Sequence, residues 1–328
     1  MDTDLIRFVA GRLLQGALVV LGVATLVFVL LHLAPGDPLT VLSDAPQVAP
    51  EALRQVRRDF GLDRPIGEQY VRYLARLVQG DLGVSITQHR PVTTALAGAI
   101  PHTLLLAAAA LLVDFAVGIG IGVAQGRRAG TRTDRLLSVV TITLYATPVF
   151  AFGLLLLGVF GETLGWFPLG GSVDPIRHAG LSVIGRAMDR LHHLALPALT
   201  LGLVAAAYTA RHQRSALLDV IQQDFVRAAR GRGLAEHAVL VRHALRNALT
   251  PTITLAGLAL PALLSGSVLV ESVFGWPGMG RLAAEAIGRR DYPIVTAAAI
   301  FAAAMVVVGN LLADLAARAA DPRLRSVR

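Results

Sequence analysis

The sequence predicts an all-α protein that is embedded in a membrane. Of its 328 residues, 54% are hydrophobic and only 16% are charged, which is more apolar surface than a single soluble core can cover. Six separate stretches are apolar over about 20 residues, the length that a helix needs to cross a hydrocarbon layer about 30 Å thick. The basic residues are all Arg, and the segments between these stretches share them unequally.

Each apolar stretch is expected to form a helix, because lipid offers the backbone no hydrogen-bonding partners. The first stretch follows Arg7 and Arg12 as the apolar part of a signal peptide would. Its apolar run is too long for that role and lacks a small-residue cleavage site, so we expect it to remain as a span. The predicted spans are residues 13–33, 104–124, 136–160, 194–210, 252–273 and 294–315.

Charge predicts the orientation of the spans. With a cytoplasmic amino terminus, the inner segments hold 17 Arg and eight acidic residues, whereas the outer segments hold 13 of each. An excess of Arg in short loops marks the cytoplasmic side. Both termini are therefore predicted to be cytoplasmic. Topology and lipid headgroups then explain the net charge of +8 better than nucleic-acid binding does.

The order of the segments predicts four parts of the chain. They are the cytoplasmic amino terminus with the first span (1–34), an external subdomain (35–99), a five-span core (100–318) and a cytoplasmic tail (319–328). The 35–99 segment is too long to be a simple connector.

Two short helices are expected in the external subdomain. Apolar residues at three- and four-residue spacing mark one face of each, and aromatic residues on such faces are expected to pack the subdomain. These residues are Leu53, Val56 and Phe60 in the first helix, and Tyr70, Leu74 and Leu77 in the second.

The cytoplasmic segment 211–250 is the most informative part of the chain. A short helix from Asp224 is expected to end near Gly231 and Gly233, since glycine tolerates the positive φ of a sharp turn. A second helix, with Leu240, Leu245 and Leu249 inward and Arg242 and Arg246 outward, then leads into the fifth span.

The short helix is expected to present one face to a partner. Helical spacing groups one aromatic ring, two small residues and one Arg, namely Phe225, Ala228, Ala229 and Arg232. A rigid projection of this kind suits a soluble protein that grips it. The alternative is an amphipathic helix on the inner leaflet, with its Arg side chains on lipid phosphates. The candidate site residues are Asp224, Phe225, Arg227, Ala228, Ala229, Arg230 and Gly233.

Four residues inside the spans are candidates for a pathway or a gate. Asp114 is costly in hydrocarbon, so it faces protein or water, as part of a path or in a structural hydrogen bond. Pro148 and Pro261 kink their helices, either to open a cavity or as static bends. Glu271 belongs to a gate or is an ordinary interfacial carboxylate.

The remaining motifs predict structure rather than chemistry. Gly118 and Gly122 are spaced for close helix packing. Among nine His residues, His192 and His193 are adjacent, but no third partner stands at ligand spacing, so no metal site is predicted. The sequence contains no catalytic constellation, no Cys, and no Lys for a phosphate-binding loop.

Several motifs together resemble one family, the dipeptide and oligopeptide permeases, which are permease subunits of bacterial ATP-binding-cassette (ABC) importers of the peptide class. The likeness extends from end to end of the chain, and the order and spacing of the motifs carry it. The motifs are residues 31–38, 60–65, 80–83, 224–251, 274–280 and 321–323.

The resemblance implies a permease of the type I importer fold in the bacterial inner membrane, with six transmembrane helices and an external subdomain between spans 1 and 2. It implies that the 211–250 segment couples to ATPase subunits. Arg227 stands where the general permease signature has Glu, and Pro251 falls later than its proline, as in the peptide branch. No role is therefore copied from that Glu.

The implied partners are a homologous second permease, two ABC ATPase subunits that bind ATP and Mg, an external substrate-binding protein, a di- or oligopeptide and membrane lipid. No cofactor is expected in this chain. Three alternatives stay open: a nickel or other small-solute permease of the same family, a secondary transporter that uses Asp114 and an ion gradient, and a membrane-embedded enzyme.

Overall fold

The computed structural model describes residues 3–33 and 63–320, without the side chains of 3–5, 253–254, 256–266 and 316–320. This part of the chain is helical, and its extended structure is limited to an isolated bridge between Val84 and Pro91. The chain divides into two compact units. Met1–Pro101 and Gly278–Val307 form the first unit, and His102–Pro277 and Val308–Arg328 form the second.

The first unit is built on long apolar helices. Its helices are α1 (Thr3–Leu33), α4 (Ile66–Val78), the start of α5 (Val92–Arg127), α12 (Met279–Gly288) and most of α13 (Tyr292–Ala320). The start of α5 packs with α12 and α13 around Val92, Met279 and Ile294. Gly16 of α1 lies directly against Val307, because a Cβ atom there would overlap that side chain.

The aromatic face predicted for the second external helix is present on α4, although it was expected to pack the external subdomain itself. It packs against α1: the Thr25 and Tyr70 hydroxyls are 2.7 Å apart, and the Phe28 ring centroid lies 5.2 Å from Tyr70 and 5.5 Å from Tyr73. The first expected external helix, with Leu53, Val56 and Phe60, lies outside the described residues. The extent of an external subdomain therefore remains a prediction.

A buried carboxylate fastens the loop before α5 to the start of α13. Asp291 is fully buried and accepts hydrogen bonds from the Ser85 hydroxyl (2.5 Å), the Ile86 N–H (3.3 Å), and the Thr87 N–H and hydroxyl (3.0 and 2.7 Å). Burial raises the pKa of Asp291, but these four donors together outweigh it and hold the pKa below the ordinary value.

The second unit holds the remaining helices. They are the rest of α5, α6 (Arg132–Ala146), α7 (Val149–Leu156), the π-helix η1 (Leu157–Thr163), the 3-10 helix η2 (His178–Gly180), α8 (Val183–Ile221), α9 (Asp224–Gly231), α10 (Glu236–Ala238), the π-helix η3 (Val239–Leu245), α11 (Arg246–Val273) and the end of α13.

Glycines of α5 allow it to approach α8 closely. A Cβ atom on Gly118 would lie 3.0 Å from the carbonyl oxygen of Ala206, and one on Gly122 would lie 2.6 Å from that of Ala210. The close packing predicted from these two glycines is therefore confirmed. Gly126 continues the same contact one turn later, against Leu217.

The predicted spans agree with the helices in part. Within the described residues, four helices are long and apolar enough to cross a membrane: α1, α5, α8 and α13. The pair α6 and α7 makes five if it is one broken span, and it bends by 105°. The predicted fifth span falls in α11, part of whose side chains lie outside the description, so six spans remain a prediction.

Two span predictions need correction. The third span was expected to be one helix over 136–160, but it breaks between Ala146 and Val149. Thr147 precedes a proline and is extended (ψ 127°), because the proline ring disfavours helical backbone at the residue before it. The fourth span was expected over 194–210, whereas α8 has 39 residues, since a helix continues into water beyond the apolar stretch.

Candidate functional site

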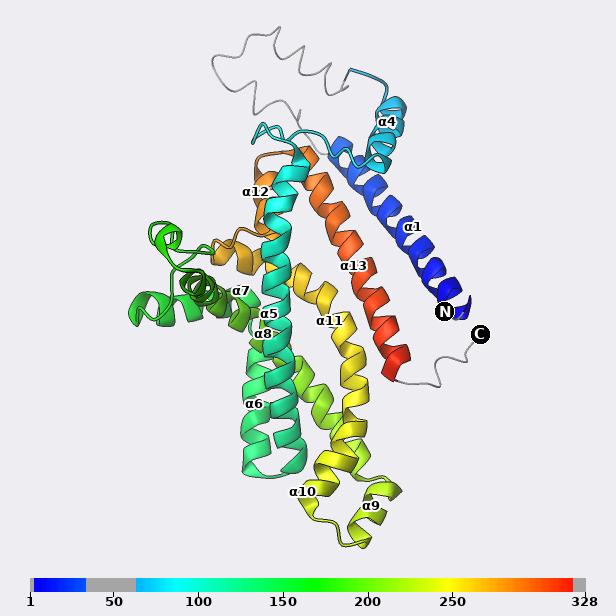
Figure 1. Ribbon diagram of the computed structural model, residues 1–328, viewed down its shortest axis with the longest axis vertical. Helices are drawn as coiled ribbons and strands as arrows, with labels where there is room; N and C mark the ends of the chain where they lie inside the picture. Colours follow the sequence, from blue (N-terminus) through cyan, green and yellow to red (C-terminus); the bar gives the residue numbers. More distant parts are fainter. Residues whose placement is uncertain (1–2, 34–62, 321–328) are drawn as a thin grey trace. The chain divides into compact units, whose positions relative to one another are not determined.

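The candidate coupling element is α9 with the turn and helices that follow it. α8 ends at Ile221, and Gln223, with an extended backbone (ψ 151°), is the N-cap residue before α9. Asp224 stands in the first turn of α9 and Arg230 in the last, where each charge is favourable to the helix dipole. Figure 1 shows α9 and α10 at the same end of the second unit as the turn between α5 and α6.

One face of α9 is buried and the other is exposed. Val226 and Ala229 are fully buried, whereas Phe225 is 39% exposed and Ala228 is exposed beside it. The sequence interpretation placed Ala229 on the presented face, which is wrong. Ala229 lies about 40° around the helix from Phe225, at the boundary between the faces, and its small side chain is covered.

The buried face of α9 packs on a core shared with α8, η3 and α11. This core is made of Leu217, Val220, Val226, Ala229, Val239, Leu240, Ala244 and Ala248. Three Leu residues of the second helix were predicted to face inward. Leu240 is buried, as predicted, and Leu245 and Leu249 are half-buried. Arg242 and Arg246 are exposed, as predicted. α9 is therefore held to α8 and α11 as one packed group.

A glycine turn and an ion pair join α9 to the next helix. Gly233 has φ +78°, the left-handed region that glycine adopts without strain. The Arg230 guanidinium donates to both oxygens of Glu236, at 2.7 and 3.1 Å. The hydrogen bond from Arg230, followed by its charge, holds the pKa of Glu236 below its usual value. The pair is largely exposed, so its main effect is to fix geometry.

The base of the element is braced by a second ion pair. Arg214 of α8 donates from Nε and Nη2 to the two oxygens of Asp134, both at 2.9 Å. The N–H of Gly130, in the turn between α5 and α6, donates to the same carboxylate at 2.9 Å. The start of α6 is therefore tied to the part of α8 that leads into α9. The sequence analysis did not identify this pair, because 80 residues separate its members.

Asp114 is buried on α5, as expected for a carboxylate that faces protein. The Thr209 side chain hydrogen-bonds the carboxylate, and one carboxylate oxygen (Oδ1) has no partner in the described part of the chain. Gln213, one turn beyond Thr209, is also buried and accepts a hydrogen bond from Thr252 at 2.6 Å. Asp114 therefore lies within the helix packing of the second unit.

The other three intramembrane candidates differ in their surroundings. Pro148 lies in the break between α6 and α7 and is the N-cap residue of α7. Pro261 lies within α11, but its side chain is outside the description. Glu271 was considered either for a gate or as an ordinary interfacial carboxylate, and it is fully buried and accepts a hydrogen bond from Thr103 at 2.7 Å.

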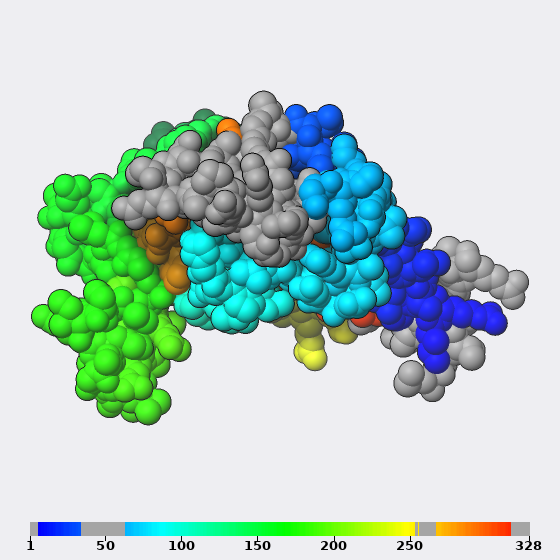
Figure 2. Space-filling view, turned by 90° about the horizontal axis from the view of Figure 1, so that it is seen from above, coloured from blue at the N-terminus to red at the C-terminus, as the bar shows by residue number. Residues whose placement is uncertain are grey.

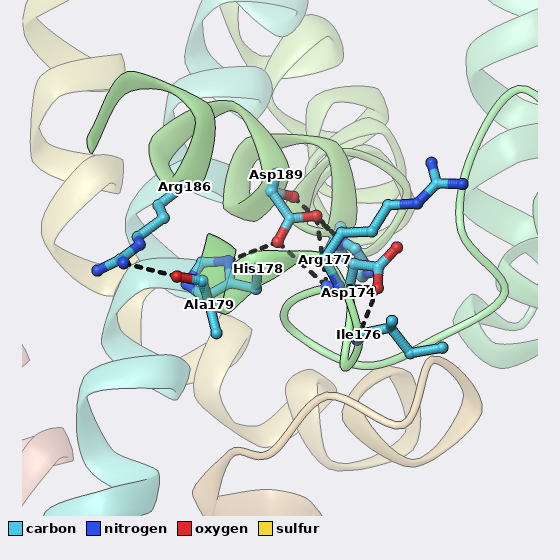
Figure 3. Close-up of polar contacts among 8 residues, drawn as sticks. Asp174, Ile176, Arg177, His178, Ala179, Arg186 and Asp189 are labelled. Atoms are coloured by element: carbon cyan, nitrogen blue, oxygen red, sulfur yellow. Dashed lines mark hydrogen bonds and ion pairs between the residues drawn. The ribbon is translucent and has the colours of Figure 1, made fainter. Parts of the chain in front are cut away.

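The first turns of α8 and the segment before it carry a second polar cluster (Figure 3). Asp189 bonds His178 at 2.6 Å, His193 lies 3.3 Å from its other oxygen, and the Asp174 N–H donates to both oxygens at 3.3 and 3.1 Å. Part of the segment before α8, which is green in Figures 1 and 2, lies on the surface seen in Figure 2. No group of three His, Cys, Asp or Glu in the described part of the chain is arranged to hold a metal ion.

An aromatic and cationic group was also missed by the sequence analysis. The Tyr145 and Tyr208 rings stack with centroids 6.4 Å apart, the Arg211 guanidinium lies over Tyr145, and His212 lies against Tyr208. The available signal was Arg211 at the end of an apolar run, which was counted only as a topology charge.

Comparison with known proteins identifies the family. Residues 116–326 match the binding-protein-dependent transport system inner membrane component, and residues 5–107 match the N-terminal component of the same kind of system.

Curated relatives match the chain over its full length. An oligopeptide transport system permease protein, AppB of Bacillus subtilis (strain 168), is 38% identical over 97% of this chain and 98% of its own. A di/tripeptide transport system permease protein, DppB of Pseudomonas aeruginosa (strain UCBPP-PA14), is 37% identical over 99% and 100%. A glutathione transport system permease protein, GsiC of Salmonella paratyphi A (strain ATCC 9150 / SARB42), is 36% identical over 98% and 99%.

Solved structures support the fold. An inward-facing MetNI methionine ABC transporter chain aligns with a TM-score of 0.54 at 19% identity, over 70% of this chain and 97% of that one. An amino acid ABC transporter chain aligns with a TM-score of 0.51 at 16% identity, over 69% and 94%. The protein is a helical, multi-pass membrane permease, and it belongs to the family of binding-protein-dependent transport system inner membrane components.

Proposed function

We propose that this chain is the permease subunit of an ATP-driven ABC importer for di- or oligopeptides. It forms the pathway with a homologous second permease, and six spans of the type I arrangement cross the inner membrane. An external substrate-binding protein delivers the peptide. Two ATPase subunits bind ATP and Mg and supply the energy, while this chain carries out no ATP chemistry. The relatives named for oligopeptide, di/tripeptide and glutathione transport favour peptide cargo over nickel.

The coupling role is assigned to the segment 211–250, on the cytoplasmic side with both termini. The observation that carries this assignment is the contrast between the two faces of α9. Its Val226 and Ala229 face is fully buried against α8 and η3, whereas Phe225 is 39% exposed. Packing on one side and a free aromatic ring on the other are what a partner protein needs in order to push or pull the helix as a unit.

The same contrast argues against α9 as a lipid-bound helix. An interfacial helix places its apolar face in the headgroup region. Here that face already packs against protein, and the large apolar side chains exposed on the described element stand at separate positions, namely Phe225, Leu234 and Val241. A protein surface with a socket for one aromatic ring fits this arrangement better than a bilayer does.

Three matched variants test the coupling role. Phe225→Ala is expected to reduce co-purification of the ATPase subunits and peptide uptake, without changing the thermal stability of the chain. Ile176→Ala removes an apolar side chain that is 88% exposed, on the face predicted to be external, and should change neither property. Val226→Ala opens a cavity at a fully buried position and should lower stability by about 1–3 kcal/mol. Full ATPase binding by Phe225→Ala would show that docking occurs elsewhere.

A further inference from the structure

The first three turns of α8 carry their apolar and polar side chains on separate sides. At about 100° per residue, four large apolar side chains fall within one arc of about 140°. They are Val183, Ile184, Met188 and Leu191. These side chains are 84%, 77%, 62% and 56% exposed, in that order. We call these four residues the apolar face of α8.

The polar side of the same turns is the covered one. The turn 174–180 lies against it (Figure 3). His178 of this turn bonds Asp189 at 2.6 Å, and Arg186 donates to a carbonyl of the turn at 2.9 Å. The side chains of Asp189 and His193 are only 11% and 7% exposed. A helix surrounded by water shows the reverse arrangement, because apolar side chains are driven out of water. The apolar face of α8 therefore needs an apolar neighbour.

The borders of the apolar face match a membrane surface. Arg190 is exposed and lies about 20° around the helix from Val183, at one border. At the other border, about 40° beyond Met188, His192 bonds the Trp166 carbonyl at 2.7 Å. Trp166 is 60% exposed. Trp is enriched where membranes meet water, and helices that lie in the headgroup region carry Arg beside their apolar face.

The chain on either side of this region is suited to the membrane. The segment 164–193 connects the bent pair α6 and α7 to the apolar stretch of α8, and both have the length and composition of membrane spans. The first three turns of α8 rise by about 15 Å, so they stay near the membrane surface only if the helix is inclined there. Pro197 permits this inclination, because it has no N–H to donate to the His193 carbonyl. The bilayer is therefore an apolar phase within reach of these turns.

We propose that the apolar face of α8 lies in the headgroup region of the bilayer, with its side chains toward the acyl chains, and anchors the segment 164–193 to lipid. The proposed topology makes this the outer leaflet. A transient protein partner fits the face less well, because such interfaces are no more apolar than ordinary surface and each departure would return the face to water. A permanent partner subunit would also be apolar, but that contact requires neither the Arg nor the Trp at the borders.

Spin labelling of single Cys variants tests the lipid contact. The chain contains no Cys, so Ile184→Cys, Met188→Cys and Leu191→Cys each place one nitroxide on the apolar face. The labelled chain is assembled with partner subunits that lack reactive Cys and is reconstituted in vesicles. Collision rates are measured with O₂, which concentrates in lipid, and with nickel ethylenediaminediacetate, which stays in water. The ratio of O₂ to nickel collisions should be several times higher at these positions than at Ile176→Cys. Ile176 is the matched control, since it is 88% exposed on the turn that covers the polar side.

Two outcomes would overturn the lipid contact. Low collision rates with both reagents at all three positions would make the apolar face a subunit interface. A ratio equal to that at Ile176→Cys would make it a water-exposed surface, open to a transient partner such as the binding protein. ATP-dependent peptide uptake is measured in the same vesicles, so a transporter that works while showing either pattern refutes the lipid contact alone and leaves the proposed function intact.

Discussion

Gly233 is the position where a single methyl group should disturb the coupling element most selectively. Its φ is +78°, and a Cβ atom there would meet no neighbour within 4 Å. The cost of Gly233→Ala therefore comes from the backbone alone, about 1–2 kcal/mol for an L-residue in the left-handed region. Gly231, within α9, is equally open but has helical backbone. Gly231→Ala should be neutral or stabilising by up to about 1 kcal/mol.

Amide hydrogen exchange of the purified transporter measures this difference. The turn is closed by the Gly233 N–H bond to the Arg230 carbonyl (2.9 Å) and the Arg232 N–H bond to the Ala228 carbonyl (3.1 Å). Strain of about 1–2 kcal/mol should speed their exchange by about 5- to 30-fold. Gly233→Asn should fall between Gly233→Ala and the original chain, because Asn adopts this conformation more readily. Equal effects of Gly231→Ala and Gly233→Ala would refute the reasoning.

Three other perturbations follow from the described contacts. Gly122→Ala places a methyl group 2.6 Å from a carbonyl oxygen of α8 and should lower the free energy of unfolding by about 1–3 kcal/mol. Gly120→Ala, whose methyl group meets nothing within 4 Å, should leave the melting temperature unchanged. Equal melting shifts in the two variants would count against close α5–α8 packing. Asp134→Asn should lower the free energy of unfolding by about 1–3 kcal/mol, since it weakens two 2.9 Å hydrogen bonds from an Arg214 side chain that is one-third exposed. An unchanged melting temperature would show that this ion pair does not stabilise the contact between α6 and α8. Because the folded pKa of Asp291 is lowered, its stabilisation is full above the ordinary carboxyl pKa of about 3.9 and is lost as pH falls through the folded pKa. Proteolysis of the 84–87 loop should accelerate only in that acid range, and Asp291→Asn should remove this pH dependence.

The pattern of apolar residues predicted where helices occur better than it predicted where they begin and end. The apolar stretches of the first, second and sixth spans correspond to α1, α5 and α13. Hydropathy marks where a helix meets lipid, however, and α8 extends past its apolar stretch to Ile221 on one side and Val183 on the other. The break after Ala146 had a local signal in Thr147-Pro148, but its 105° angle depends on how α7 packs against α8 and α11.

The sequence predicted which residues form α9, but it placed the side chain of Ala229 on the wrong face of the helix. Helical spacing alone groups Ala229 with Phe225 as readily as with Val226, and only the core beneath α9 decides between them. Glu271 shows the same limit, because the Thr103 hydroxyl that donates to its carboxylate is 168 residues away. Contacts of this range leave no mark in a local pattern.

Peptide uptake into vesicles tests the proposed energy coupling most directly. The transporter is reconstituted with and without its ATPase subunits, and a labelled dipeptide is supplied with the external binding protein. Uptake should require both ATP and the ATPase subunits, and Phe225→Ala should reduce it while Ile176→Ala leaves it intact. Accumulation by this chain alone, driven by an ion gradient, would contradict the assignment of α9 as the point where energy enters.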